Sequence, residues 1–257
     1  MNKAIHCHFR ISKFEQEFPF YRDNKYDLEI YLPGEYVDDW QTSGVKEQIT
    51  EIMESYNPSL TIHAPIYDFS PTSLDPVIRK LWMQRTLECF KVADFCHAKN
   101  IVFHSNYSDL HYSRVKQKWV ERTAAFWREA AKEVPENVKI AIENIYDSGP
   151  ELLAQVIDEV NHPQVGHCFD IGHYAVWGNR VSVEEWLKHF DGKIFELHLH
   201  DNMGDIDSHL GMGQGTIDFA SLFKALGTLK DDPEYCIEGM KPEDNVICLE
   251  YLRKHLK

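Results

Sequence analysis

The sequence lacks the hydrophobic segments that a membrane or secreted protein needs. No apolar run among its 257 residues approaches the roughly 20 that cross a bilayer. The opening stretch, MNKAIHCHF, has no apolar signal-peptide core. We therefore expect a cytoplasmic protein with no membrane partner.

Paired cysteines and linker-like segments are also missing. The six cysteines are scattered singly and form no Cys-x-x-Cys pair, which argues against a disulfide framework or a thiolate zinc site and indicates reduced core thiols. No stretch rich in Pro, Gly or Ser and no charge block divides the chain. Because α/β barrels often fill about 200 to 250 residues as one unit, we predict a single domain over residues 1–257.

Basic residues are in short supply. Lys and Arg number 27 against 41 Asp and Glu, a net charge of −14, and no basic cluster is denser than Lys116-Gln117-Lys118. Affinity for nucleic acid comes mainly from Lys and Arg that neutralise phosphates. The charge balance counts against a nucleic-acid partner, although a bound metal cluster could reverse the sign locally.

Short apolar runs alternate with amphipathic segments along the whole chain, as expected of βα units around a parallel sheet. The strand candidates are Ala4–Phe9, Asp27–Leu32, Leu60–Ala64, Ile101–His104, Lys139–Glu143, Val165–Asp170, Ile194–His200 and Tyr235–Glu238. The helix candidates are Ser43–Ser55, Asp75–His97, Ser113–Val134, Pro150–Val160, Val183–Phe190, Asp218–Leu229 and Glu243–His255, after a short, poorly patterned connection near Lys13–Phe18.

Eight such units favour an α/β fold of the closed (β/α)₈ TIM-barrel type. A dinucleotide-binding open sheet would need a Gly-rich loop after the first strand, and HCHFRISK contains no glycine. Asp75 with Pro76, Ser148 or Asp147 before Pro150, and Asp218 before Ser221 are candidate helix starts.

Metal-ligand side chains stand at the end of strand after strand, where the loops of a barrel form its active site. A loop after the seventh strand adds two more. The candidates are His63, His104, Glu143, Asp170, His173, His198, Asp207, His209 and Glu238. One such histidine alone would be read as a core or capping residue. Since charged groups are rarely buried unless they are paired or bound to metal, the joint pattern predicts a site for zinc, manganese or iron.

The seventh strand and its loop form the centre of this pattern. Alternation places Phe195, Leu197 and Leu199 on one face and Glu196, His198 and His200 on the other. Three glycines follow at alternate positions, Gly211, Gly213 and Gly215, and let the backbone turn sharply near a ligand.

Several further side chains are candidates to surround the site. His6 and His8 alternate on the first strand, and His8 is a candidate substrate-binding group. Glu29 is either an acid behind the metal ligands or a partner of a loop lysine. Five aromatic residues follow ligand-bearing strands and are candidate pocket walls: Tyr67, Phe69, Tyr146, Tyr174 and Trp177. By contrast, helical spacing assigns Trp82, Trp119 and Trp127 to packing between helices and barrel, and Cys168 is assigned to the core.

The motifs HAP, IVFH, IEN, FDIGH, HLHDN and D-x-H-L-x-x-G-x-G-x-I-D, between Leu60 and Gly239, together resemble the xylose-isomerase-like TIM-barrel superfamily. That superfamily includes sugar-phosphate isomerases and epimerases and endonuclease IV. Likeness to endonuclease IV implies a three-zinc cluster on all nine candidate ligands. Glu143 would bridge two metals, His63 and His104 would hold one of them, and Asp207 and His209 would hold the third. Likeness to ketose 3-epimerases implies one metal on Glu143, Asp170, His198 and Glu238, with the two glutamates as an acid/base pair; the additional substrate-binding glutamate and arginine of those enzymes are not evident.

Three functions follow as hypotheses. We favour a metal-dependent isomerase, epimerase or lyase of a small sugar or sugar phosphate, in which Glu143 and Glu238 move the proton. The alternative is a multinuclear zinc phosphoesterase of the abasic-site endonuclease type. The third is a metal- or sugar-binding protein without catalysis. One to three divalent ions fit these hypotheses, and a homo-oligomer is left open.

Overall fold

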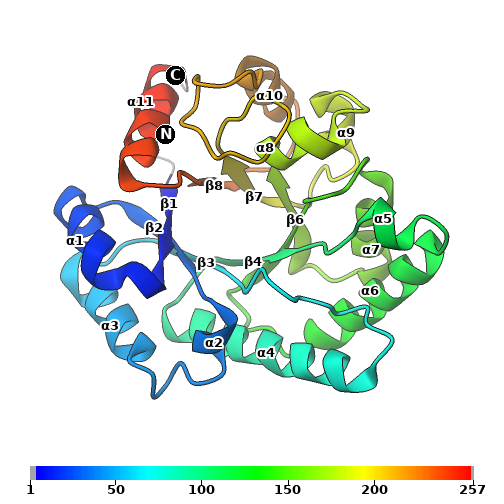
Figure 1. Ribbon diagram of the computed structural model, residues 1–257, viewed down its shortest axis with the longest axis horizontal. Coiled ribbons are helices and arrows are strands. Elements are labelled where there is room, and N and C mark those ends of the chain that lie inside the picture. Colours follow the sequence, from blue (N-terminus) through cyan, green and yellow to red (C-terminus); the bar gives the residue numbers. More distant parts are fainter. Residues whose placement is uncertain (1–3, 256–257) are drawn as a thin grey trace.

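A computed structural model of the protein describes residues 4–255. Eight parallel strands form a closed barrel in the order β1 to β8, and helices surround it (Figure 1). The predicted TIM barrel is confirmed. The strands are β1 (Ile5–Arg10), β2 (Asp27–Tyr31), β3 (Leu60–His63), β4 (Asn100–His104), β5 (Lys139–Glu143), β6 (Val165–Asp170), β7 (Ile194–Leu199) and β8 (Glu234–Ile237).

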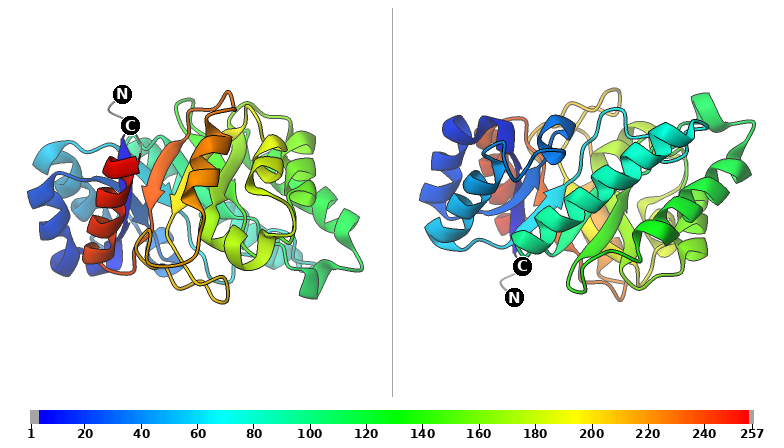
Figure 2. Two further views of the ribbon diagram at one scale, coloured as in Figure 1. Left: turned by 90° about the horizontal axis from the view of Figure 1, so that it is seen from above. Right: turned by 90° about the horizontal axis from the view of Figure 1, so that it is seen from below.

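The main helices occupy the predicted segments, and several short ones were not foreseen (Figures 1 and 2). The helices are α1 (Phe14–Asn24), α2 (Gly34–Val37), α3 (Val45–Tyr56), α4 (Pro76–Phe95), α5 (Asp109–Tyr112), α6 (Lys116–Ala130), α7 (Glu151–Val160), α8 (Ile171–His173), α9 (Val183–Lys188), α10 (Phe219–Leu226) and α11 (Pro242–His255). Among residues 4–255, no helix has the length and apolar character needed to cross a membrane.

The first connection is a full helix and not the short, poorly patterned segment expected near Lys13–Phe18. Helix α1 runs from Phe14 to Asn24 and contains Pro19. Phe14, Phe18 and Tyr21 pack against Phe9 of β1, with ring centroids 5.5 to 6.3 Å apart. The internal proline, a strong helix breaker in most contexts, obscured this apolar stripe in the sequence.

The predicted helix starts are confirmed in two cases of three. Asp75 accepts a hydrogen bond from the Val77 amide, and Asp218 accepts one from Ser221. The helix predicted after Pro150 forms, but the side-chain cap expected from Ser148 or Asp147 is absent. Helix α7 begins without a side-chain cap, because the Asp147 carboxylate instead accepts hydrogen bonds from the Ser105 hydroxyl and the Ile145 amide.

Two apolar layers lie on opposite sides of the barrel wall. Trp82, Trp119 and Trp127 are buried outside the strands, as their helical spacing predicted. A smaller cluster inside contains Cys168 with Val102 and Ala141, and this confirms Cys168 as a packing residue.

The expected alternation of β7 fails at Phe195. The pairing of β6 with β7 shifts register between His167 and Cys168. As a result Phe195 packs against the cluster inside the barrel and does not join Leu197 and Leu199 on the outer face. Beyond this irregularity the inward face carries His198 toward the mouth of the barrel.

Candidate functional site

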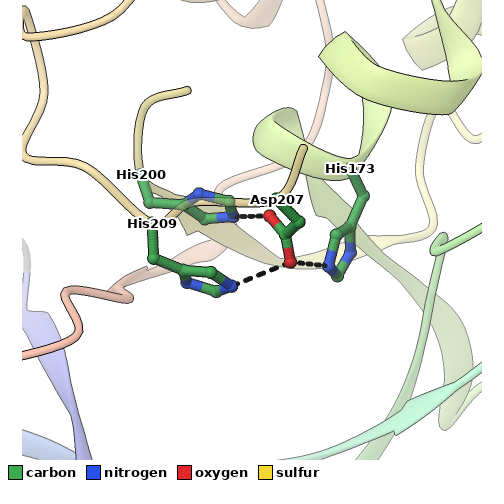
Figure 3. Close-up of side chains that lie close together, drawn as sticks. All are labelled: His173, His200, Asp207 and His209. Atoms are coloured by element: carbon green, nitrogen blue, oxygen red, sulfur yellow. Dashed lines mark hydrogen bonds and ion pairs between the residues drawn. The ribbon is translucent and has the colours of Figure 1, made fainter. Parts of the chain in front are cut away.

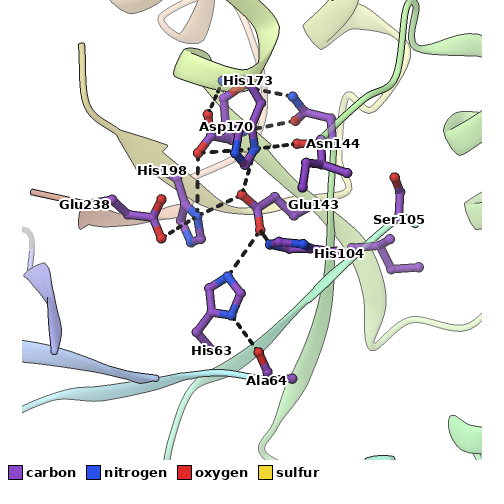
Figure 4. Close-up of polar contacts among 12 residues, drawn as sticks. His63, Ala64, His104, Ser105, Glu143, Asn144, Asp170, His173, His198 and Glu238 are labelled. Carbon is purple, nitrogen blue, oxygen red and sulfur yellow. Dashed lines mark hydrogen bonds and ion pairs between the residues drawn. The ribbon is translucent and has the colours of Figure 1, made fainter. Parts of the chain in front are cut away.

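The nine candidate ligands meet at the carboxyl ends of the strands. His63, His104, Glu143 and Asp170 each end a strand, His198 lies one residue before the end of β7, and Glu238 follows β8. His173 lies in α8, and Asp207 and His209 lie in the loop after β7. Figure 4 shows the strand-end residues pointing toward a common centre. The barrel geometry thus gathers side chains that are up to 175 positions apart in the sequence.

The first group consists of His63, His104 and Glu143. Both Nε2 atoms lie 3.3 Å from Glu143 Oε2. That oxygen is buried and has no hydrogen-bond partner. His63 donates its Nδ1 proton to the Ala64 carbonyl at 2.8 Å, so Nε2 is the ring atom that can bind a metal once it has lost its own proton.

The second group joins Glu143 to Asp170, His198 and Glu238, with all four ligand atoms within 4.8 Å of one another. His198 Nδ1 lies 3.2 Å from Glu143 Oε1 and 3.3 Å from Glu238 Oε1. Its Nε2 lies 3.1 Å from Glu29 Oε2. When Nε2 donates its proton to Glu29, Nδ1 is the ring atom that can bind a metal after it loses its own proton.

The third group consists of His173, His200, Asp207 and His209 (Figure 3). Asp207 Oδ2 lies 3.2 Å from His173 Nε2 and 2.9 Å from His209 Nε2. The two Nδ1 atoms donate to the carbonyls of Asn144 and Glu238, at 2.9 and 2.8 Å. His200 stacks on His209 with ring centroids 3.9 Å apart and reaches Asp170 Oδ2 at 3.1 Å.

These donor groups fit divalent metal ions. Ligand atoms bound to one zinc at about 2.0 to 2.2 Å cannot be more than about 4.4 Å apart, close to the spacing found here. Backbone carbonyls fix the outer nitrogens of His63, His173 and His209, the arrangement that orients histidine ligands in metal sites. Glu143 Oε2 lies between two imidazole nitrogens and is buried without a hydrogen-bond partner. A bound cation would provide the partner that this oxygen lacks.

Electrostatics in the metal-free cluster show how the charges balance. Burial alone would raise the pKa of Glu143, but His198 and His104 hold it well below its usual range. Burial alone would lower the pKa of His63, but the adjacent Glu143 carboxylate outweighs this effect and raises the pKa to about 9. Imidazolium groups therefore supply, without metal, the positive charge that the buried carboxylates require.

A single buried carboxylate, Asp201, shapes the loop that carries Asp207 and His209. Its Oδ2 accepts hydrogen bonds from the amides of Gly213 and Gly215, both at 2.9 Å. A Cβ at Gly215 would lie 2.3 Å from Asp201 Oδ1, so only glycine allows this approach. The loop is held as a unit.

Most of the candidate ligands line a cavity of about 390 Å³, which His8 also lines, while the fully buried Asp170 and His198 are not part of its lining. Tyr67, 80% exposed, and Tyr146, 48% exposed, stand at its edge as expected. Trp177, a further candidate, is not among the lining residues: its ring packs edge-on against Tyr146, with centroids 4.8 Å apart, and lies 5.7 Å from the His173 ring. It therefore supports the wall and does not line the cavity.

Two other aromatic candidates are wrong as walls of this cavity. Phe69 is buried among Trp82, Phe103 and Trp127, so it belongs to the packing outside the barrel. Tyr174 donates its hydroxyl to the Val181 carbonyl at 2.7 Å and turns away from the site.

The sequence interpretation missed Arg10 and His200 and left the role of Glu29 open. Arg10 lines the cavity, pairs with Glu17 and donates to the Met240 carbonyl. Glu29 is fully buried and contacts His198 and His8, not a lysine. Alternation could have found Arg10, which shares the inward face of β1 with His8. His200 could have been identified in the same way, because it alternates with His198 on one face of the seventh strand.

Replacing Glu29 with glutamine is expected to weaken zinc binding about 10- to 100-fold, because His198 loses the charged acceptor that fixes its tautomer. Competition with a chromophoric chelator measures this. The matched control is Glu196→Gln, another buried barrel acid, which accepts from Asn100 at 3.0 Å and whose pKa burial raises to about 8. Equal zinc affinities for the two variants would contradict the role of Glu29.

Comparison with known proteins gives one family model that matches residues 22–254, described as the xylose isomerase-like TIM barrel. The uncharacterized protein MJ1311 of Methanocaldococcus jannaschii is 27% identical over 217 residues, covering 81% of this chain and 74% of that protein.

Solved structures share the fold. A D-tagatose 3-epimerase-like protein superposes with a TM-score of 0.81 at 22% identity, covering 98% of this chain and 97% of the other. The TTHB071 protein of Thermus thermophilus, from crystals soaked with zinc chloride, gives 0.79 at 22% identity with the same coverage. An L-ribulose 3-epimerase gives 0.75 at 17% identity, covering 95% and 83%.

Proposed function

The chain belongs to the xylose isomerase-like TIM-barrel family, and from this premise we propose that it is a divalent-metal-dependent isomerase or epimerase, or a related lyase, of a small sugar or sugar phosphate. One observation carries the proposal. The carboxylates of Glu143 and Glu238 face the same nitrogen of His198, at 3.2 and 3.3 Å, in the floor of a cavity of about 390 Å³. Two carboxylates so placed can remove and return a proton at one carbon of a bound sugar.

The two glutamates differ in access. Glu143 is fully buried among His63, His104 and His198. Glu238 is slightly exposed and lies 3.4 Å from His8, which lines the cavity. We assign to Glu238 the first proton transfer with substrate and to Glu143 the opposing position, with His8 as a hydrogen-bonding group for a substrate hydroxyl.

The cavity suits a compact, polar molecule. Its floor consists of imidazoles and carboxylates, while Tyr67 and Tyr146 cover the edge. Its volume lies at the lower end of the roughly 300 to 1,000 Å³ typical of small-molecule sites. Neighbours named as a D-tagatose 3-epimerase-like protein and an L-ribulose 3-epimerase support a sugar substrate.

The donor groups support one to three ions of zinc, manganese or iron. Glu143, Asp170, His198 and Glu238 would hold the ion. A divalent ion there supplies polarisation of a carbonyl and its neighbouring hydroxyl. The structure of the IOLI protein with a binding zinc atom, which superposes with a TM-score of 0.75 at 18% identity, supports metal binding by this fold.

Exchange of solvent deuterium into a panel of ketoses and aldoses tests the proposed function, with NMR as the readout. We expect exchange by the metal-loaded protein, and a loss of about 10²- to 10³-fold in Glu238→Gln, which keeps the shape but not the base. Glu243→Gln, at an exposed acid of α11, is the matched control. Absence of exchange across the panel would exclude the isomerase and epimerase activities.

A second candidate function, metal-dependent phosphoester hydrolysis, is favoured by a separate observation. Three donor groups lie side by side, and Glu143 belongs to two of them, as a multinuclear hydrolytic site requires. In addition, residues 76–132 carry 11 Lys and Arg against 5 Asp and Glu in an otherwise acidic chain. Arg79, Lys80 and Arg122 of this segment line a surface hollow. Efficient incision of an abasic-site duplex that weakens steeply with salt, with no sugar exchange, would establish this candidate instead.

A further inference from the structure

A second and larger hollow, which we call the side groove, lies beside the catalytic cavity. Its volume is about 960 Å³, and residues following β3 and β4 line it together with the first half of α4. We propose that the side groove binds a planar aromatic group joined to the sugar, so that the natural substrate is a sugar derivative with an aromatic moiety. The sugar end of this substrate rests on the proposed function, while the aromatic end rests on the groove itself.

The side groove borders the catalytic cavity. Tyr146 lines both. Along the loop after β3, Ile66 and Tyr67 line the cavity, and the next two residues, Asp68 and Phe69, line the groove. A ligand whose sugar occupies the cavity can therefore extend past Tyr146 into the groove without crossing the barrel wall.

The lining favours an apolar ring over a charged group. Phe69, Trp82 and Tyr107 form buried parts of it, and Ile78 and Leu81 of α4 are each 40% exposed. Its arginine, Arg85, already pairs with Asp38, at 2.7 Å between Nη2 and Oδ2, and stacks over the Trp82 ring. The exposed parts of Ile78, Leu81 and Tyr146, backed by these buried aromatic side chains, give a flat ring apolar area to cover.

The groove wall is built as a fixed surface. Asp109 accepts hydrogen bonds from the Tyr107 and Ser148 hydroxyls, at 2.6 and 2.7 Å, and pairs with Lys116 at 3.0 Å. These contacts tie α5, which projects at one edge of the molecule (Figure 2), to the loop after β5. The hydroxyls of Tyr107 and Ser148 lower the pKa of Asp109 to about 2, so the tie persists over the neutral range.

Backbone strain gathers at the two hollows. Four of the non-glycine residues with positive φ, Lys25, Asn57, His97 and Asn161, lie at helix C-terminal ends, where this conformation is routine. The other three do not. Asp68 (φ 60°) and Asn106 (φ 54°) line the side groove, and His209 (φ 47°) lines the cavity. Strain of this kind concentrates at ligand sites, which supports a binding role for the groove.

Calorimetric titration of the zinc-loaded protein with phenyl and methyl β-D-glucopyranoside, and with the corresponding xylopyranosides, tests the proposal. The phenyl form of each pair is expected to bind about tenfold more tightly than the methyl form. Leu81→Asp and Ile78→Asp, at half-open positions of the lining, should remove this preference. Val77→Asp is the matched control, because Val77 lies on the same helix and is 72% exposed but does not line the groove.

Equal binding of the phenyl and methyl forms, including no binding of either, overturns the proposal, as does loss of the preference in Val77→Asp alone. Thermal melting of the variants shows that each is folded. Two variants of the lining are used so that the test still holds if one of them does not fold. Solvent deuterium exchange into free sugars separates this result from the proposed function. A phenyl preference without exchange overturns the proposed function alone, and exchange without a phenyl preference overturns the groove alone.

Discussion

Replacement of Glu143 with glutamine is expected to lower turnover about 10³- to 10⁴-fold and to reduce the zinc bound per chain. Glu143 is the one residue shared by the first and second donor groups: Oε2 faces His63 and His104, and Oε1 faces His198. An amide keeps the shape of the side chain but offers no negative charge to a cation and no base to a substrate. Both effects therefore come from one substitution.

Metal analysis after equilibration with zinc, together with deuterium-exchange rates, measures both parts of this prediction. The control is Glu133→Gln, at an exposed acid after α6. A Glu143→Gln protein that binds as much zinc as the parent and retains its rate would show that the donor groups are not a metal centre. Far-ultraviolet circular dichroism establishes that the barrel has formed in each variant.

Zinc affinity is expected to rise steeply with pH, and most steeply at the third group. Burial alone lowers the pKa values of His173 and His209, but Asp170 and Asp207 raise the first well above its usual value and the second to about 9. Both rings must lose a proton before Nε2 can bind metal, so affinity should rise about 100-fold per pH unit below pH 8. The first group has only one such ring, because burial keeps the pKa of His104 low, and about tenfold per unit is expected there.

The stability of the metal-free protein should change in the opposite direction. A histidine whose pKa is raised by folding stabilises the folded state fully below its unfolded pKa of about 6.5. This contribution is lost as pH rises through about 9, the folded value for His63 and His209. Zinc titrations and thermal melts across the neutral range, from below the unfolded pKa toward the folded one, measure both trends. A zinc affinity that does not change with pH would contradict the assignment of these rings as metal ligands.

The positions of the strands could be predicted because their signal is local. The bounds of β5 and β6 agree with the predicted segments at both ends, and each ends in an acid, Glu143 or Asp170. A parallel barrel places all such ends at one mouth, so the convergence of the candidate ligands follows once the fold is known. Eight local sequence patterns, together with the barrel fold, were therefore enough to predict that the candidate ligands meet at one place.

The remaining features depend on packing that no local pattern specifies. Tyr67 and Phe69 are two residues apart in one loop, yet the first reaches the cavity and the second is buried beside Trp82. The inward turn of Phe195 results from a register shift between two strands. Glu29 became identifiable as the partner of His198 only when β2 and β7 faced each other across the barrel.

The candidate ligands at the strand ends come from six strands, β3 to β8. The site can therefore form only late in folding. Atoms that become neighbours only when the last strand closes the ring cannot guide the earlier steps of folding, since each pairing must first bring together distant parts of the chain. A metal cluster here would assemble after the barrel has closed, and it would stabilise the closed barrel. In the closed barrel, before any ion binds, the histidine–carboxylate pairs keep the acids together at the positions where the ions would bind.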